Sequence, residues 1–496
     1  MLKTGFIDEI ELEFGNGNRH VDIKFGILNH GTLDSRERED AKKINIAVIG
    51  LPESINGFLE WLKECNDGID AKDTSKSNLF PKFPGFGCNS PFNAEWECSE
   101  RAMRYLSLSK IKELESLKTP GEIIKGAVKI YASELDYIAN EIRPDVIFCI
   151  TPNEIADQLD RAVELPCTKI KKQEDIDDAE RVNQHRYDFH HCLKSEAMIY
   201  KIPIQMIYPS TFGVGKRGKS TKNKRRNKKQ RQLQDPATCA WNLFTAMYYK
   251  AGGTPWRLAR QPNDFTTCYV GVSFYRSLDE KTVMTSIAQI FNERGEGVVV
   301  RGGQAMLSKK DRTPHLNRDD SVSIITQALK RYRDEHKTSP ARVVIHKSSY
   351  FTDEEQKGFR DGLEQERISM VDMLSIRKSN VRLFRSGAYP VLRGTHLQLD
   401  SQRHLLYTRG SVPFFETYPG LYLPRALEIQ FDSIEQSREL LCNEILALTK
   451  MNWNNTQFDM SEPITLRAAR SVGDIMKYIP AEASLGRIAS RYSFYM

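Results

Sequence analysis

Three short apolar runs, separated by segments of helical length, constrain the fold of the first half of the chain most strongly. The runs cover residues 44–49, 145–150 and 204–208, and a helical pattern at residues 120–142 lies between the first two. Strands that alternate with helices form parallel sheets, because each parallel connection needs a long crossover. The sequence therefore predicts an α/β, Rossmann-like domain. Before it, apolar positions alternate from Ile7 to Phe25 around residues 15–18, which predicts a hairpin.

A second series of strands and helices follows residue 261. Strand patterns occur at residues 267–275, 298–300 and 342–346, and helical patterns occur at 321–336, 437–450 and 463–478. A chain of 496 residues is also too long for one small core. We therefore expect two α/β domains, one over residues 1–260 and one over residues 261–496.

The stretch from residue 185 to residue 205 contains the first candidate site. His190 and Lys194 are four residues apart, so on a helix they share one face, and Gln205 opens the next apolar run. Pro203 is expected to end the helix. A lysine, an amide and an aromatic ring suit a phosphorylated nucleotide end. The alternative is a surface helix with a solvated lysine and a hydrogen-bonded histidine.

The net charge of +7 comes from one short segment. Residues 216–231 contain ten basic residues and no acid, so the net charge of the rest of the chain is close to −3. Such a segment is typical of a loop that contacts a polyanion, although a solvated loop without a partner remains an alternative. The residues predicted to contact a nucleic-acid backbone are Lys216, Arg217, Lys224, Arg225, Arg226, Lys228 and Lys229.

The sequence also argues against several classes of protein. It contains no run of eighteen apolar residues, so no membrane span is expected, and its first residues lack the apolar core of a signal peptide. Its nine cysteines are scattered and form no C-x-x-C pair. This pattern fits a protein of the reducing cytoplasm and argues against a disulfide framework or a zinc knuckle.

Several separated motifs between about residues 140 and 480 resemble the short prokaryotic Argonautes, which consist of MID and PIWI domains only. His190, Lys194, Gln205 and Lys250 match the pocket that binds the 5′ end of the guide, and residues 250–256 look like the family's Lys-x-Gly-Gly-x-Pro-Trp. The resemblance implies a Rossmann-like MID domain followed by an RNase H-like PIWI domain. It also implies Mg²⁺ at the guide 5′-phosphate, held in part by Gln205 and by the C-terminal carboxylate, here that of Met496.

The chain departs from the family at the nuclease site. A PIWI domain that cuts its target needs acidic residues to hold two metal ions. This chain has Ser273 where the first aspartate is expected and Ser348 where the second is expected. The glycine pair at 302–303 is followed by Gln304 and Ala305, with no glutamate to complete the set. We therefore expect no catalytic residues and a degenerate site.

The resemblance implies a function in prokaryotic defence against plasmids or phage, including abortive infection. The chain is expected to bind a guide RNA, to recognise complementary single-stranded DNA without cutting it, and to activate a separate partner. That partner carries an APAZ domain fused to a TIR, a sirtuin-like NADase or a nuclease, and we favour the NADase. The alternatives are an active guide-directed nuclease and an RNA-binding chaperone without a partner.

Overall fold

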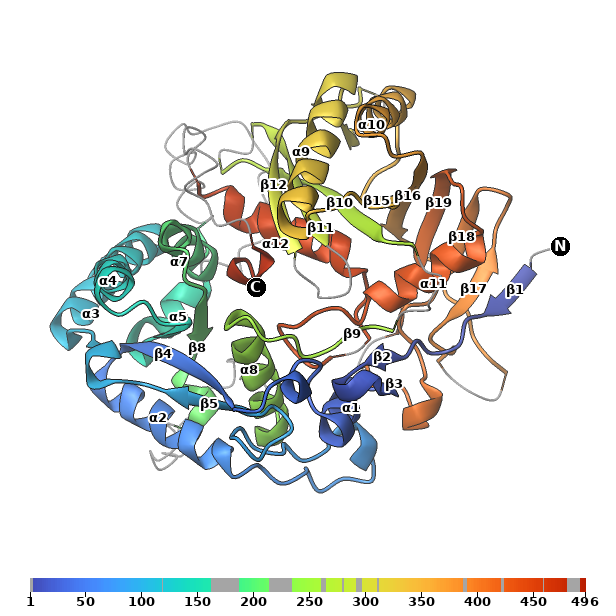
Figure 1. Ribbon diagram of the computed structural model, residues 1–496. Coiled ribbons are helices and arrows are strands. Elements are labelled where there is room, and N and C mark those ends of the chain that lie inside the picture. Colours follow the sequence, from blue (N-terminus) through green and yellow to red (C-terminus); the bar gives the residue numbers. More distant parts are fainter. Residues whose placement is uncertain are drawn as a thin grey trace.

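The computed structural model contains both of the predicted α/β units (Figure 1). The residues that it describes are 3–117, 119–161, 187–213, 234–259, 265–278, 281–290, 297–309, 312–386, 390–420, 423–457, 459–479 and 491–496. The basic segment at 216–231 lies outside these ranges, so its contact with nucleic acid stays a prediction. Among the described helices, none is long and apolar enough to cross a membrane.

The first sheet is parallel throughout, as predicted. Its order is β5-β4-β7-β8, and the short strand β6 also pairs with β4. The strands are β4 (Lys42–Gly50), β5 (Ala94–Glu97), β6 (Met103–Tyr105), β7 (Val146–Ile150) and β8 (Ile204–Ile207). All five residues of β7 are buried, because helices cover both faces of the sheet.

Alternate residues of the central strands enter two different cores. Val48 and Phe148 pack with α2 and α8, whereas Ile49 and Ile147 pack with α4 and α7. The helices of this unit are α2 (Pro52–Asn66), α3 (Leu108–Glu115), α4 (Pro120–Glu141), α5 (Asn153–Arg161), α7 (Phe189–Ala197) and α8 (Pro236–Lys250). The period-two alternation of a strand thus fixes which helix lies over which face.

The second sheet has nine strands, and its centre has the RNase H-like order. Strands β12, β11 and β10 are antiparallel neighbours, and β10, β15 and β16 continue the sheet in parallel. These strands are β10 (Thr267–Arg276), β11 (Val283–Ile290), β12 (Gly297–Gln304), β15 (Arg342–Lys347) and β16 (Met370–Lys378). The sheet is extended by β19 (Leu427–Ser433), β18 (Arg403–Leu406), β17 (Thr395–Gln398) and β1 (Lys3–Phe6), and β13 (Met306–Leu307) pairs separately with β14 (Pro314–His315).

Two pairs of helices cover the opposite faces of this sheet (Figure 1). One pair is α9 (Arg318–His336) and α10 (Asp353–Gln365), whose apolar side chains share a core with Val272 and Ile345. The other pair is α11 (Arg438–Leu448) and α12 (Ile464–Met476), which pack on the reverse face. Both pairs bury the sheet, and this explains the near-continuous apolar runs in its parallel strands.

The N-terminal segment joins the two units and differs in part from the sequence prediction. β2 (Leu12–Glu13) and β3 (Arg19–His20) form the expected hairpin, and Asn16 takes the left-handed conformation at its turn with φ 58°. The expected strand at residues 21–25 is wrong, because α1 (Ile23–His30) begins there. The Asp22 side chain accepts the Phe25 N–H and caps this helix. β2 also pairs with β9 (Arg257–Leu258). β1 pairs with β17 and so joins the second sheet. The domain boundary near residue 260 stays a prediction.

The contact between α12 and β10 leads to a stability prediction. A Cβ atom on Gly271 would collide with the main-chain oxygen of Thr465, which cannot move without shifting α12. Gly271→Ala should therefore destabilise the protein by about 1–3 kcal/mol, as overpacking does. Urea unfolding should show this loss, whereas Gly87→Ala serves as the control because nothing lies within 4 Å of its Cβ position. Equal stability of the two variants would contradict the tight packing of α12.

Candidate functional site

The first candidate site begins at helix α7. The side chain of Asp188 accepts the His191 N–H at 2.8 Å and caps the helix. Phe189 and Leu193 are buried against α4, as expected for the apolar face of an amphipathic helix. The helix ends at Ala197, earlier than the predicted stop at Pro203, because the chain tightens into a 3-10 turn before the left-handed residue Lys201.

Two lysines from different helices converge on the last residue of the sequence. Lys194 on α7 and Lys250 at the end of α8 both direct their Nζ atoms at the main-chain oxygen of Met496, and the Lys250 distance is 3.5 Å. Lys250 also donates to Oε1 of Gln205 at 2.6 Å and to the carbonyl oxygen of Ile204 at 3.1 Å. The structure therefore brings Lys194, Gln205, Lys250 and Met496 together, as the sequence analysis expected.

Both lysines of this group are deeply buried. Only 2% of Lys194 and 6% of Lys250 is exposed. Burial lowers the pKa of Lys194 to about 7, although Asp188 opposes the shift. Burial also lowers the pKa of Lys250 well below its usual value, and the charge of Lys194 adds to the effect. Both lysines contact the carboxylate of the last residue, Met496, and within the described part of the chain neither pairs with a side-chain carboxylate. One negative charge therefore faces two lysines, and the pair is suited to bind a further anion.

His190 lies one helical turn before Lys194 and is exposed. Desolvation lowers the pKa of its ring well below the usual value, and the charges of Lys194 and Lys250 lower it further. An accessible imidazole beside two lysines can stack on a base or donate a hydrogen bond to a ligand.

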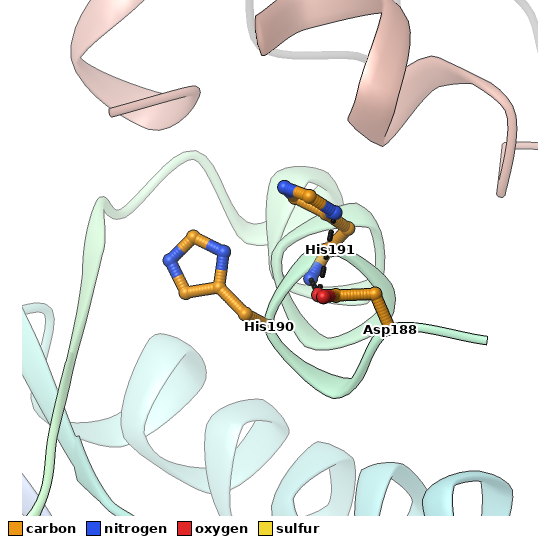
Figure 2. Close-up of side chains that lie close together, drawn as sticks. All are labelled: Asp188, His190 and His191. Atoms are coloured by element: carbon orange, nitrogen blue, oxygen red, sulfur yellow. Dashed lines mark hydrogen bonds and ion pairs between the residues drawn. The ribbon is translucent and has the colours of Figure 1, made fainter. Parts of the chain in front are cut away.

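A second reading of this helix end is a metal site. Asp188, His190 and His191 bring their possible ligand atoms within 4.8 Å, and no other part of the described chain contains such a group of three (Figure 2). Figure 2 shows the two imidazoles projecting in different directions, with His191 beside Asp188. The site lies at the positive end of the α7 dipole. The negative charges of Asp188 and Asp474 act on His191 together with the opposing positive charges of Lys477 and Lys194.

The sequence analysis missed some residues that position the site. The Tyr478 hydroxyl accepts the Asp188 N–H at 3.0 Å, which joins the end of α12 to the start of α7. The Ile204 carbonyl oxygen orients Lys250. The capping role of Asp188 could have been predicted from the sequence, because an aspartate directly precedes an apolar helical pattern. The contact with Tyr478 had none, since it joins residues that are far apart in the sequence.

The second candidate site is the centre of the large sheet. Ser273 lies on β10, and Ser348 follows β15. The Ser348 N–H donates to the carbonyl oxygen of Val272 at 3.1 Å, so both serines lie at neighbouring strands. Ser273 is 3% exposed and Ser348 is half-buried. The structure thus places the two serines together.

Helix α12 covers the strand face that carries Ser273. Gly271 and Tyr275 flank Ser273 on this face, and they contact Thr465 and Gly473 of α12. Residues 465, 469 and 473 follow the four-residue spacing of one helical face, so the helix presents Ala469 between these two contacts. A small apolar residue of α12 therefore stands opposite Ser273.

Comparisons with known proteins give matches only at the level of structure. No family model matches the sequence, and no curated protein matches it. Clostridium butyricum Argonaute, solved with a guide DNA and a 19-mer target DNA, matches with a TM-score of 0.64 and 15% identity over 97% of this chain and 54% of its own. Drosophila Piwi matches with a TM-score of 0.59 and 14% identity over 99% of this chain and 56% of its own. Marinitoga piezophila Argonaute, solved with a 5′ OH guide RNA, matches with a TM-score of 0.55 and 12% identity over 99% of this chain and 59% of its own.

These matches are too distant in sequence to transfer residue roles, but they agree on the arrangement of elements. The chain spans little more than half the length of the solved proteins. Its parallel first sheet and its RNase H-like second sheet follow one another in the order of MID and PIWI domains. The chain therefore has an Argonaute-like fold, with a MID domain followed by an RNase H-like PIWI domain.

Proposed function

We propose that the chain binds the 5′-phosphorylated end of a guide RNA and uses the guide to recognise complementary single-stranded DNA. The observation that carries this proposal is the pair of buried ammonium groups, Lys194 and Lys250, on one shared oxygen. The shared oxygen belongs to the carboxylate of Met496, so one negative charge faces two lysines; a phosphate would add negative charge and would accept charge-assisted hydrogen bonds from both lysines. His190, on the exposed side of the same helix, would contact the first nucleotide.

We also propose that Mg²⁺ binds beside the lysines, where oxygen ligands are available. Magnesium prefers oxygen ligands, and Oε1 of Gln205 and the main-chain oxygen of Met496 both lie within reach of Lys250 Nζ, at 2.6 and 3.5 Å. These two atoms would hold the ion beside the phosphate, where it would supply further positive charge. The lysines provide the remaining neutralisation and the orientation of the phosphate.

The depressed pKa of Lys194 makes guide binding pH-dependent. In the free protein this pKa is about 7, so above pH 7 the lysine must take up a proton before it can pair with phosphate. The affinity for a 5′-phosphorylated guide should therefore fall between pH 7 and 9, by up to about tenfold per pH unit. Fluorescence anisotropy should show this fall, with a 5′-hydroxyl guide as a flat control. Lys194→Arg should reduce the slope and leave only the part that comes from Lys250, because arginine stays charged; an unchanged slope would contradict the role of Lys194.

We also propose that the PIWI domain does not cut its target. Ser273, Ser348 and Ala469 occupy a face where two divalent cations would need carboxylate ligands, and serine and alanine supply no negative charge. The runner-up is an active guide-directed nuclease with an unusual metal set.

A cleavage assay separates these two functions. The pure chain, a guide RNA and a labelled complementary DNA should give a stable complex with intact target in Mg²⁺ or Mn²⁺. Guide-dependent cleavage that is abolished by His346→Ala would overturn the proposal. Cleavage that survives this change would show a contaminating nuclease, and repurification should then remove it.

We further propose that target binding activates a separate protein, an APAZ-domain effector. We favour an NADase over a nuclease as the activity of that effector. The support is the Argonaute-like fold together with serines in place of nuclease carboxylates, which leaves the chemistry to another protein. Expression with the product of the neighbouring reading frame should yield a complex that consumes NAD⁺ only with guide and target present. A chain that binds guide and purifies alone from its native host would instead support the chaperone alternative.

A further inference from the structure

The strands β18, β17 and β1 form one edge of the large sheet (Figure 1), and two histidines lie against each other on this edge. His396 on β17 and His404 on β18 have nearly parallel rings, with an interplanar angle of 9° and centroids 6.1 Å apart. His404 is 7% exposed, and His396 is half-buried. The two imidazoles therefore share one confined space.

Three of the four ring nitrogens of this pair are shielded from solvent and have no hydrogen-bond partner within the described residues. They are Nδ1 of His396 and both Nδ1 and Nε2 of His404. A neutral imidazole has one N–H donor and one acceptor nitrogen, so the closed pair leaves buried polar groups unsatisfied. Such groups cost free energy, and water would satisfy them if the pair opened.

The surroundings oppose a positive charge on His404. Burial lowers the pKa of His404, and the charges of His396 and Arg438 lower it further, whereas Asp400 acts in the opposite direction. Arg438 is the first residue of α11. The carboxylate of Asp400 already pairs with Arg403 at 2.8 Å, which reduces its effect on the imidazole. His404 is therefore held in its neutral form while the edge is closed.

The other elements packed around the pair do not supply a compensating negative charge. The register of β1 places Lys3 opposite Gln398, on the same face as His396. On β19, Glu428 lies opposite Leu405, so its side chain is on the other face of the sheet from His404. Glu439 in the first turn of α11 is exposed, and water and salt screen its charge.

Strand β1 is weakly held at this edge. It is the last strand of the sheet and pairs with β17 over four residues, three of which are exposed. Gly5 lies directly against His396, because a Cβ atom at Gly5 would collide with the imidazole ring. A segment with few buried contacts opens at low cost. The contact of the Glu9 carboxylate with Arg393 Nε, at 3.0 Å, holds the chain beyond β1 and limits the opening to this strand.

We propose that His396 and His404 form a pH-sensitive switch, which separates their rings in mild acid and releases β1 from β17. The switch is independent of the proposed guide site. An imidazole in water binds a proton near pH 6.5. The open form therefore takes up a proton below this pH that the closed form excludes. The closed form is favoured above about pH 6.5 and loses stability as the pH falls, by up to about tenfold per pH unit for one histidine.

Hydrogen exchange of the main-chain amides measures this opening directly. A peptide that contains residues 3–7 should be followed by mass spectrometry in the full chain between pH 7.5 and 5.5, with each rate divided by the intrinsic rate at that pH. Protection of β1 should fall about tenfold over this range, while protection of the central strand β10 stays constant. Protection of β1 that stays constant as well would overturn the proposal.

Three variants test the role of the histidines. His404→Phe keeps a ring against Phe431 but cannot bind a proton, so it should remove the pH dependence. His315→Phe is the matched control, since His315 lies in the separate sheet of β13 and β14, and it should keep the pH dependence. Gly5→Ala should push the His396 ring aside and lower the protection of β1 already at pH 7.5.

In each variant, protection of β10 equal to that of the wild type shows that the chain is folded. A fall in β1 protection that persists in His404→Phe would overturn the proposal, because the proton would then bind elsewhere. Unchanged β1 protection in Gly5→Ala would also overturn it, because the position of the His396 ring would then have no effect on the strand. Loss of the pH dependence in His315→Phe would assign the effect to a different histidine.

Discussion

Glu9→Ala is expected to destabilise the protein by about 3–5 kcal/mol, because it leaves two buried cations without their carboxylate. The Glu9 carboxylate contacts Arg393 Nε at 3.0 Å and Lys450 Nζ at 2.7 Å, and both cationic side chains are 0% exposed. Burial acts to raise the pKa of Glu9, but the charges of Arg393 and Lys450 outweigh it and lower the pKa. Glu9 is therefore ionised at neutral pH, and its loss removes a full charge from the interior.

The neutral acceptors beside these cations do not supply the charge of Glu9. Arg393 also donates to Thr449 Oγ1 at 2.8 Å, and Lys450 donates to the Val21 carbonyl oxygen at 2.8 Å. These acceptors are neutral, so they satisfy hydrogen bonds but not charge. Urea unfolding at pH 7 should show the loss, with Glu11→Ala as the control because Glu11 is exposed. A change of less than about 1 kcal/mol in Glu9→Ala, similar to a surface substitution, would contradict this account.

Lys250→Met should abolish most of the preference for a 5′-phosphorylated guide. The ammonium group of Lys250 is buried and contacts both Gln205 and Met496, so it has the most contacts in the proposed site. Loss of a charge-assisted hydrogen bond to phosphate costs about 1.5–3 kcal/mol, which is roughly 10- to 150-fold in affinity. Binding of a 5′-hydroxyl guide should change much less, because it lacks the charge that Lys250 neutralises.

The matched control for this variant is Lys129→Met. Lys129 is exposed on α4, so the substitution removes one positive charge without touching the proposed site. The two variants should be compared by anisotropy with phosphorylated and hydroxyl guides of one sequence. If both variants lower the affinity for both guides equally, Lys250 acts only through general charge, and the assignment of the phosphate site is wrong.

The spacing of apolar residues correctly predicted the strands and the helix face that depend on neighbouring residues in the sequence. The parallel strands β4, β7 and β8 followed from apolar runs between helices, and the buried face of α7 followed from its spacing of apolar residues. The side chains on that helix face were therefore predictable. That Lys194 and Lys250 meet came from the family resemblance, because no spacing rule joins two helices so far apart in the sequence.

The features that the sequence did not predict depend mostly on contacts between residues that are far apart in the sequence. β1 is only Lys3–Phe6, with mostly exposed residues and no alternation, and it is a strand because β17 offers it an edge. The run at residues 23–25 resembles a strand, but the Asp22 cap stabilises the helix α1. The partners of Glu9 lie in the C-terminal half of the chain, so its importance was invisible in the sequence.

The most direct test of the central claim compares two guides on the unmodified chain. Guide RNAs of one sequence, with a 5′-phosphate or a 5′-hydroxyl, should be titrated against the protein with Mg²⁺ present. The account predicts that the phosphorylated guide binds at least about tenfold more tightly, since Lys194 and Lys250 would each donate a charge-assisted bond to it. Equal affinities for the two guides would contradict the claim that this site binds a 5′-phosphate.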